Sequence, residues 1–90
     1  MSRFAYVNGS YVPHREAAVH IEDRGYQFGD GVYEVVLLIN SKMADCEGHL
    51  KRLNRSLCKL KMKSPLSEGA LRQIMARLTR LNRLETGTIY

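Results

Sequence analysis

The chain has 90 residues, enough for one small domain that buries about 60–65% of its unfolded surface and is only marginally stable alone. Its apolar fraction of 44% is ordinary for a globular protein, and no window approaches the roughly 20 apolar residues of a membrane-spanning helix. The net charge of +5 is compatible with nucleic-acid binding, but the basic residues are spread from Lys51 to Arg83 over expected helix faces without interleaved aromatics, so we expect no nucleic-acid partner.

The cysteines and the first residues indicate a reducing compartment. Cys46 and Cys58 are too few and too isolated to form a disulfide framework, which favours two free thiols. Met1 to Phe4 contain no apolar core of a secretory signal. We therefore expect a cytoplasmic location and no membrane partner. Because cysteines and histidines do not cluster, we expect no bound metal.

Short strands and tight turns are predicted for the beginning of the chain. Phe4 to Val7 has the composition of a strand, and Asn8-Gly9 is the strongest two-residue hairpin signal. The returning strand is expected at Ser10 to Val12 and is stopped by Pro13. Ala17 to Ile21 is predicted to form another short strand.

The run from Arg24 to Val35 combines three glycines with three aromatic residues. Asp30 between two glycines is typical of a tight turn, and from Val32 onward the residues favour β structure. Such a turn, which leads an aromatic residue and a carboxylate into a buried strand, often places side chains at a site. Taken by itself, the run favours a turn followed by core aromatics.

Residues Val32 to Ile39 predict a strand that is covered on both faces, because Glu34 is their single polar member. A buried carboxylate needs a partner, so we expect Glu34 to form an ion pair with Arg24 or with a residue beyond the end of the chain. Alternation divides the side chains between two faces, one with Tyr33, Val35, Leu37 and Ile39 and the other with Val32, Glu34, Val36 and Leu38.

A second hairpin and two helices are predicted next. Asn40-Ser41 forms the turn, and Lys42 to Ala44 the short return strand. Asp45 is a suitable N-cap for a helix from about Glu47 to Met62, which Ser64-Pro65 ends. The leucines of this helix recur at steps of three and four, which indicates one buried stripe: Leu50, Leu53, Leu57 and Leu60.

Ser67 is a suitable N-cap for the second helix, with Glu68 in its first turn. The buried stripe of this helix is expected to contain Leu71, Ile74, Met75, Leu78 and Leu81. After a break at Thr86-Gly87, Thr88 to Tyr90 begin another strand.

This order of elements predicts an α+β fold, in which a small antiparallel sheet carries two helices packed on one side. We expect residues 1–90 to form a single N-terminal domain. The chain stops at Tyr90 within a predicted strand. We therefore expect the fold to be truncated in its last strand and the chain to be part of a longer protein.

Three stretches carry a family resemblance: Asp23 to Val35, His49-Leu50-Lys51-Arg52, and Thr86 to Tyr90. Together they resemble the class IV (fold type IV) pyridoxal-phosphate enzymes, most closely the D-amino acid aminotransferases, and the resemblance covers nearly the whole chain. It implies the cofactor pyridoxal 5′-phosphate and transfer of an amino group between a D-amino acid, such as D-alanine, and a 2-oxo acid. It also implies a homodimer.

The resemblance gives roles to residues that are ambiguous by themselves. Arg52, three positions after His49, would bind the cofactor phosphate, whereas the residues alone favour a solvated arginine. Tyr33 and Val35 would form a wall of the substrate pocket, whereas Tyr33 alone could be a core aromatic. The roles of His49 and Tyr90 stay open: His49 either packs the helix or contacts the site, and Tyr90 aligns with a family tyrosine near it.

The lysine that forms a Schiff base with the cofactor lies in the second domain of the family. The lysines of this chain match hairpin or helix-surface positions instead, so we expect the 90 residues alone to be inactive. The alternatives are another class IV enzyme, such as a branched-chain aminotransferase or an aminodeoxychorismate lyase, and a basic binding module without catalysis.

Overall fold

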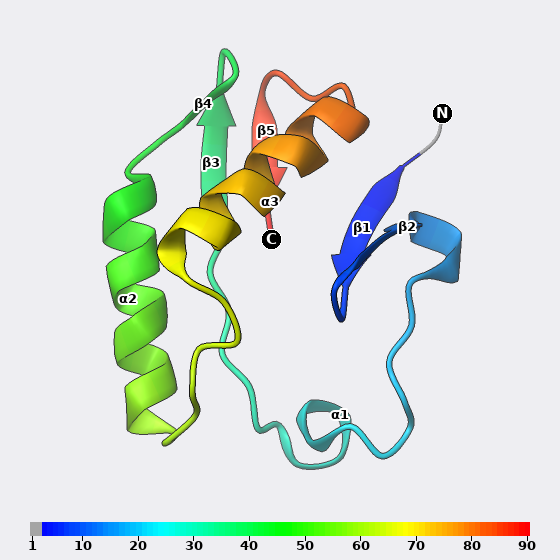
Figure 1. Cartoon of the computed structure of the whole chain (residues 1–90), viewed down its shortest axis with the longest axis vertical. Helices are drawn as coiled ribbons and strands as arrows, with labels where there is room; N and C mark the ends of the chain where they lie inside the picture. The colour runs from blue at the N-terminus through cyan, green and yellow to red at the C-terminus, as the bar shows by residue number, and fades with distance from the viewer. Residues whose placement is uncertain (1–2) are drawn as a thin grey trace.

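A computed structural model describes residues 3–90 and has an α+β fold, as predicted (Figure 1). Two antiparallel sheets are present among these residues, a two-stranded sheet β1-β2 and a three-stranded sheet with the order β4-β3-β5. In chain order the elements are β1 (Phe4–Val7), β2 (Ser10–Pro13), η1 (His14–Glu16), α1 (Arg24–Phe28), β3 (Val36–Ile39), β4 (Lys42–Met43), α2 (Cys46–Lys59), α3 (Glu68–Leu81) and β5 (Gly87–Ile89). The element η1 is a single turn of 3-10 helix.

Both predicted hairpins are confirmed. β1 pairs with β2 through Asn8 and Gly9, whose φ angles of 49° and 92° are those of a tight two-residue turn. Asn40 and Ser41 join β3 to β4 with φ angles of 48° and 66°. In each case the turn residues adopt the left-handed conformation that this hairpin type requires.

The single predicted sheet is divided into two, and α3 explains the division. The backbone N–H of Phe4 donates to the side-chain oxygen of Asn82 at 2.9 Å, and the Asn82 amide donates to the Phe4 carbonyl at 3.2 Å. Asn82 caps the C-terminal end of α3. The outer edge of β1 is thus hydrogen-bonded to the end of a helix at this point instead of to another strand.

The two long helices begin at the predicted caps. The Asp45 carboxylate accepts from the Gly48 backbone N–H at 3.2 Å at the start of α2, and the Ser67 hydroxyl accepts from Ala70 at 3.1 Å at the start of α3. α2 ends at Lys59, earlier than the predicted Met62, because Lys61 has a φ of 57° that is incompatible with a helix.

Two predicted strand segments are wrong. Residues 17–21 are exposed and form no strand, and residues 32–35 precede the sheet instead of belonging to it. β5 pairs with β3 only from Val36 to Leu38, so no described strand lies beside the segment 32–35.

The turn expected within residues 24–35 is a short helix, α1. Asp23 caps its N-terminus by accepting a hydrogen bond from the Gly25 N–H at 2.8 Å. Gly29, with a φ of 72°, caps its C-terminus.

The predicted alternation along residues 32–39 is confirmed, but the prediction that both faces are covered is wrong. Val36 and Leu38 of β3 are buried together with three residues of α2, namely Cys46, Leu50 and Leu57. Leu37 and Ile39 are 45% and 46% exposed. β3 therefore contributes one face to the core, and its other face is open.

No helix within residues 3–90 is long and apolar enough to cross a membrane. Cys46 is buried and Cys58 is exposed, and both are free thiols, as the sequence predicts.

Candidate functional site

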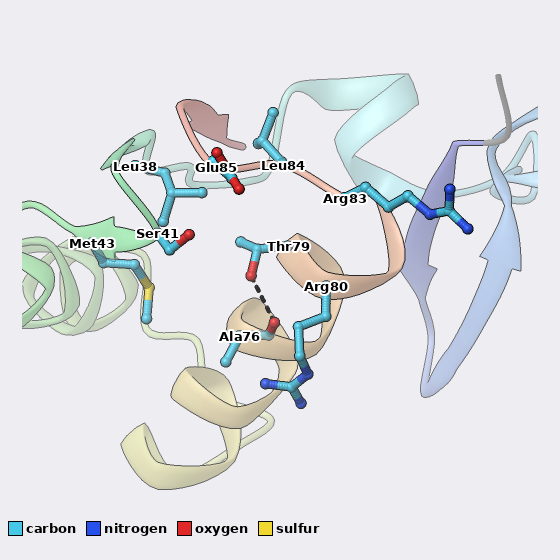
Figure 2. A pocket seen from close by; sticks show the side chains of 9 residues that line it. All are labelled: Leu38, Ser41, Met43, Ala76, Thr79, Arg80, Arg83, Leu84 and Glu85. Atoms are coloured by element: carbon cyan, nitrogen blue, oxygen red, sulfur yellow. Dashed lines mark hydrogen bonds between the residues drawn. The ribbon is translucent and has the colours of Figure 1, made fainter.

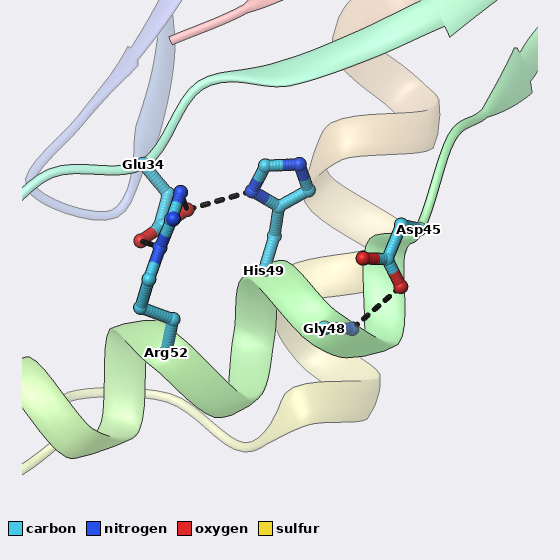
Figure 3. A network of polar contacts seen from close by, with 5 residues as sticks. All are labelled: Glu34, Asp45, Gly48, His49 and Arg52. Atoms are coloured by element: carbon cyan, nitrogen blue, oxygen red, sulfur yellow. Dashed lines mark hydrogen bonds and ion pairs between the residues drawn. The ribbon is translucent and has the colours of Figure 1, made fainter.

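The Glu34 carboxylate is held by two side chains of α2 (Figure 3). Its Oε2 accepts a hydrogen bond from Arg52 Nε at 2.7 Å, and its Oε1 accepts one from Arg52 Nη2 at 2.8 Å. Its Oε1 also lies 2.7 Å from Nδ1 of His49. We call these three residues the Glu34 cluster. Both carboxylate oxygens are occupied, and the arginine contact is bidentate.

Helix geometry explains why two partners reach one carboxylate. His49 and Arg52 are three positions apart on α2, so their side chains project from the same face. Glu34 precedes β3 and points to the same side of the chain as the buried residue Val36. Glu34 is the most enclosed member, with 11% of its side chain exposed, against 57% for Arg52. The cluster therefore ties the segment before β3 to α2.

The cluster changes the acidity of its members. Hydrogen bonds from Arg52 and then from His49 stabilise the ionised carboxylate and lower the pKa of Glu34 from 4.5 to about 2, against the opposing effect of burial. The hydrogen bond to Glu34 and the attraction of its charge raise the pKa of Arg52 above its ordinary value. The carboxylate of Asp45 adds a smaller electrostatic attraction to Arg52.

This shift predicts acid sensitivity. Because the pKa of Glu34 is lower in the folded chain, its contribution to stability is present above pH 4.5 and is lost as the pH falls toward about 2. The difference in melting temperature between the wild type and Glu34→Gln should therefore shrink over this range. Thermal unfolding of both proteins from pH 7 to pH 2.5 measures it, with Glu22→Gln in the exposed segment as control. A difference that stays constant with pH would contradict the assignment.

Arg52 keeps donors that Glu34 does not use. An arginine carries five N–H donors, of which Glu34 accepts two, so three remain on a side chain that is 57% exposed. A planar fork of such donors suits the oxygens of a phosphate. The arrangement therefore fits the phosphate of a cofactor. No group of three or more potential metal ligands occurs within residues 3–90.

Tyr33 and Val35 flank Glu34 on the chain and lie on the opposite, open side. Tyr33 is 71% exposed, and its ring stacks on that of Tyr90 with centroids 6.0 Å apart and an interplanar angle of 25°. Tyr33 is thus the chain neighbour of Glu34, which binds Arg52 of α2, but no hydrogen bond between the side chains of Tyr33 and Arg52 is present among the described residues. Tyr90, whose role the sequence left open, thus lies against Tyr33 through this stacking contact.

The predicted ion pair of Glu34 is confirmed, but its partner is Arg52 and not Arg24 or a residue beyond the end of the chain. Arg24 bonds instead to Asp30, with Nη2 at 2.8 Å from Oδ2 across the end of α1. His49, whose role the sequence left open, contacts Glu34 through Nδ1. The signal in the sequence was a lone carboxylate in an apolar run, followed by His49 and Arg52 at helical spacing.

An open cavity of about 390 Å³ lies elsewhere, between the β3–β4 hairpin and the C-terminal half of α3 (Figure 2). The Thr79 hydroxyl in its wall donates to the Ala76 carbonyl at 2.7 Å. Figure 2 shows that the guanidinium groups of Arg80 and Arg83 extend away from the cavity. No residue of the Glu34 cluster lines it, so it is separate from the candidate site.

Comparison with known proteins identifies relatives. The sequence model of the family described as amino-transferase class IV matches residues 31–90. The chain is 45% identical over 84 residues to a protein named D-alanine aminotransferase from Listeria monocytogenes, which covers 93% of this chain and 29% of that protein. It is 39% identical over 83 residues to the Bacillus licheniformis protein of the same name, with coverages of 92% and 29%. For the Staphylococcus aureus protein of that name, the identity is 36% over 85 residues, with coverages of 94% and 30%. The chain therefore spans about three tenths of the length of these relatives.

Proposed function

Because the chain belongs to the class IV aminotransferase family, we propose that it is the N-terminal part of a pyridoxal-phosphate-dependent transaminase. The complete protein, meaning this chain with the remainder of the length of its relatives, would transfer an amino group between a D-amino acid, such as D-alanine, and a 2-oxo acid. The relatives named D-alanine aminotransferase, at 36–45% identity, support this substrate class.

The observation that carries the proposal is how the Arg52 side chain is held and exposed. It is anchored on one side by Glu34, is more than half exposed, and has donors left for an anion. Its place three residues after His49 on α2 matches the position at which this family is expected to bind the cofactor phosphate. Pyridoxal phosphate, when bound, supplies the electron-withdrawing ring that makes amino-group transfer possible.

The remaining residues of the site would shape the substrate pocket. Tyr33 and Val35 lie on the open side of the segment before β3 and would form one wall. The Tyr33 hydroxyl is a donor and an acceptor, so it suits a substrate carboxylate or the cofactor-bearing lysine.

This chain has no candidate for that lysine. A lysine that carries the cofactor and moves a proton needs a lowered pKa, and thus a partly buried place. The chain has five lysines, all exposed: Lys42, Lys51, Lys59, Lys61 and Lys63. We therefore propose that residues 1–90 form the N-terminal domain, which is inactive alone, within a cytoplasmic homodimer.

Assays of the complete protein test the proposal. We expect an absorbance change on addition of pyridoxal phosphate, and formation of pyruvate from D-alanine in the presence of 2-oxoglutarate. L-Alanine serves as the matched control and should be a much poorer substrate. Preference for L-leucine, or cleavage of aminodeoxychorismate, would favour another class IV enzyme. Failure to bind the cofactor, together with salt-dependent binding of nucleic acid, would favour the basic binding module.

A further inference from the structure

We infer that Glu34 is a positioning residue that holds the Arg52 guanidinium in place for an anion, and that His49 in turn holds Glu34. The inference rests on the proposed function, because it takes the cofactor phosphate as the anion. The Glu34 carboxylate is negatively charged and cannot itself bind a phosphate. The inference explains why an enclosed carboxylate nevertheless lies beside the proposed phosphate ligand.

Glu34 contacts only one edge of the Arg52 guanidinium. Glu34 contacts Nε and Nη2 at 2.7 and 2.8 Å, so the plane and the direction of the guanidinium are both determined. A long, exposed arginine without such a contact samples many rotamers, and ordering them on ligand binding lowers affinity. With the contact, the directions of the unused donors are fixed before the anion arrives.

His49 completes the arrangement from the other side. Its Nδ1 lies 2.7 Å from the same Oε1 that accepts from Arg52, and its side chain is 21% exposed. The carboxylate is thus fixed by two residues one helical turn apart. Glu34 cannot follow Arg52 if the arginine moves toward solvent, which makes it an anchor and not merely a counter-ion.

The negative charge of Glu34 acts against this role, since it repels a phosphate. The repulsion is the weaker effect here for two reasons. A phosphate on the unused donors would touch Arg52 directly, while the guanidinium would separate it from Glu34, and charge interactions weaken with distance. In addition, Oε1 of the carboxylate is engaged by a second hydrogen-bonding partner, Nδ1 of His49 at 2.7 Å. We therefore expect the loss of Glu34 to weaken anion binding.

The test compares two ligands that differ only in the phosphate, pyridoxal 5′-phosphate and pyridoxal, and measures dissociation constants by absorbance on the complete protein. Residues that orient a ligating side chain typically contribute about 10- to 100-fold in affinity at metal sites. For Glu34→Gln we expect about a tenfold loss of affinity for pyridoxal phosphate, at the low end of that range, and little change for pyridoxal. The control is Glu47→Gln, which removes an exposed carboxylate paired with Lys51 on the same helix. It should alter neither constant.

The two proposals fail in different ways. If Arg52→Ala leaves the affinity for pyridoxal phosphate unchanged, the assignment of Arg52 to the phosphate is wrong. If Arg52→Ala weakens binding but Glu34→Gln does not, or if Glu34→Gln binds the phosphate more tightly, the positioning role is wrong. In the double variant, the effect of Glu34→Gln should vanish, because Glu34 acts only through Arg52.

A second variant guards against misfolding of Glu34→Gln. Glu34→Asp keeps the negative charge but shortens the side chain by one methylene, so it breaks the bidentate contact. We expect the same selective loss for pyridoxal phosphate. Unchanged affinity for the phosphate in this variant would mean that only the charge of residue 34 matters, and would overturn the inference.

Discussion

Replacing Arg52 with alanine in the complete protein should weaken binding of pyridoxal 5′-phosphate by about 10- to 100-fold. A hydrogen bond to a charged group contributes about 1.5–3 kcal/mol, and each 1.4 kcal/mol is a factor of ten in affinity. The unused donors of Arg52 are expected to make such bonds with the phosphate. The measurement is a titration followed by absorbance. Arg52→Lys should be intermediate, because it keeps the charge and loses the planar fork.

The matched control for this prediction is Arg72→Ala, which removes an exposed arginine from α3. Its affinity for the cofactor should equal that of the wild type. Arg52→Ala should also lower the melting temperature, since Glu34 is then left with His49 as its remaining partner. A lower melting temperature with unchanged cofactor affinity would mean that Arg52 is purely structural.

The elements that the sequence predicts correctly depend on neighbouring residues. Asn8-Gly9 and Asn40-Ser41 form hairpins because both members of each pair tolerate a positive φ. Asp45 and Ser67 cap their helices through bonds to residues only three positions away. Such features need no knowledge of the rest of the fold.

The elements that the sequence predicts wrongly depend on distant partners. A run of β-forming residues becomes a strand only where another strand lies beside it. Residues 36–38 have β5 as a neighbour and form β3, whereas residues 32–35 have the same apolar character but no strand beside them within residues 3–90. Residues 17–21, which also have no strand beside them among the described residues, remain exposed.

The same distinction between neighbouring and distant partners applies to the candidate site. The sequence indicates that Glu34 needs a partner, because a carboxylate in an apolar run is costly when unpaired. It does not identify the partner, because Arg52 is 18 positions away and meets Glu34 only through the packing of α2. The resemblance to a family selected Arg52 as a phosphate ligand. The contact that would position it is visible only in the structure.

The core should be most sensitive at Leu38. This residue lies on the central strand β3 and is 2% exposed. Truncation of a buried leucine to alanine typically costs about 2–5 kcal/mol. A domain of this size has a total stability of roughly 5–13 kcal/mol, so Leu38→Ala should remove a large part of it. The loss corresponds to a melting temperature lower by at least about 8 °C.

The neighbouring residue provides the control. Leu37 is on the same strand, but its side chain lies on the open face and is 45% exposed. Leu37→Ala in the 90-residue chain should cost less than about 1 kcal/mol. Urea denaturation followed by circular dichroism measures both variants. Equal losses at the two positions would mean that both faces of β3 are covered in solution, which would contradict a core on one face only.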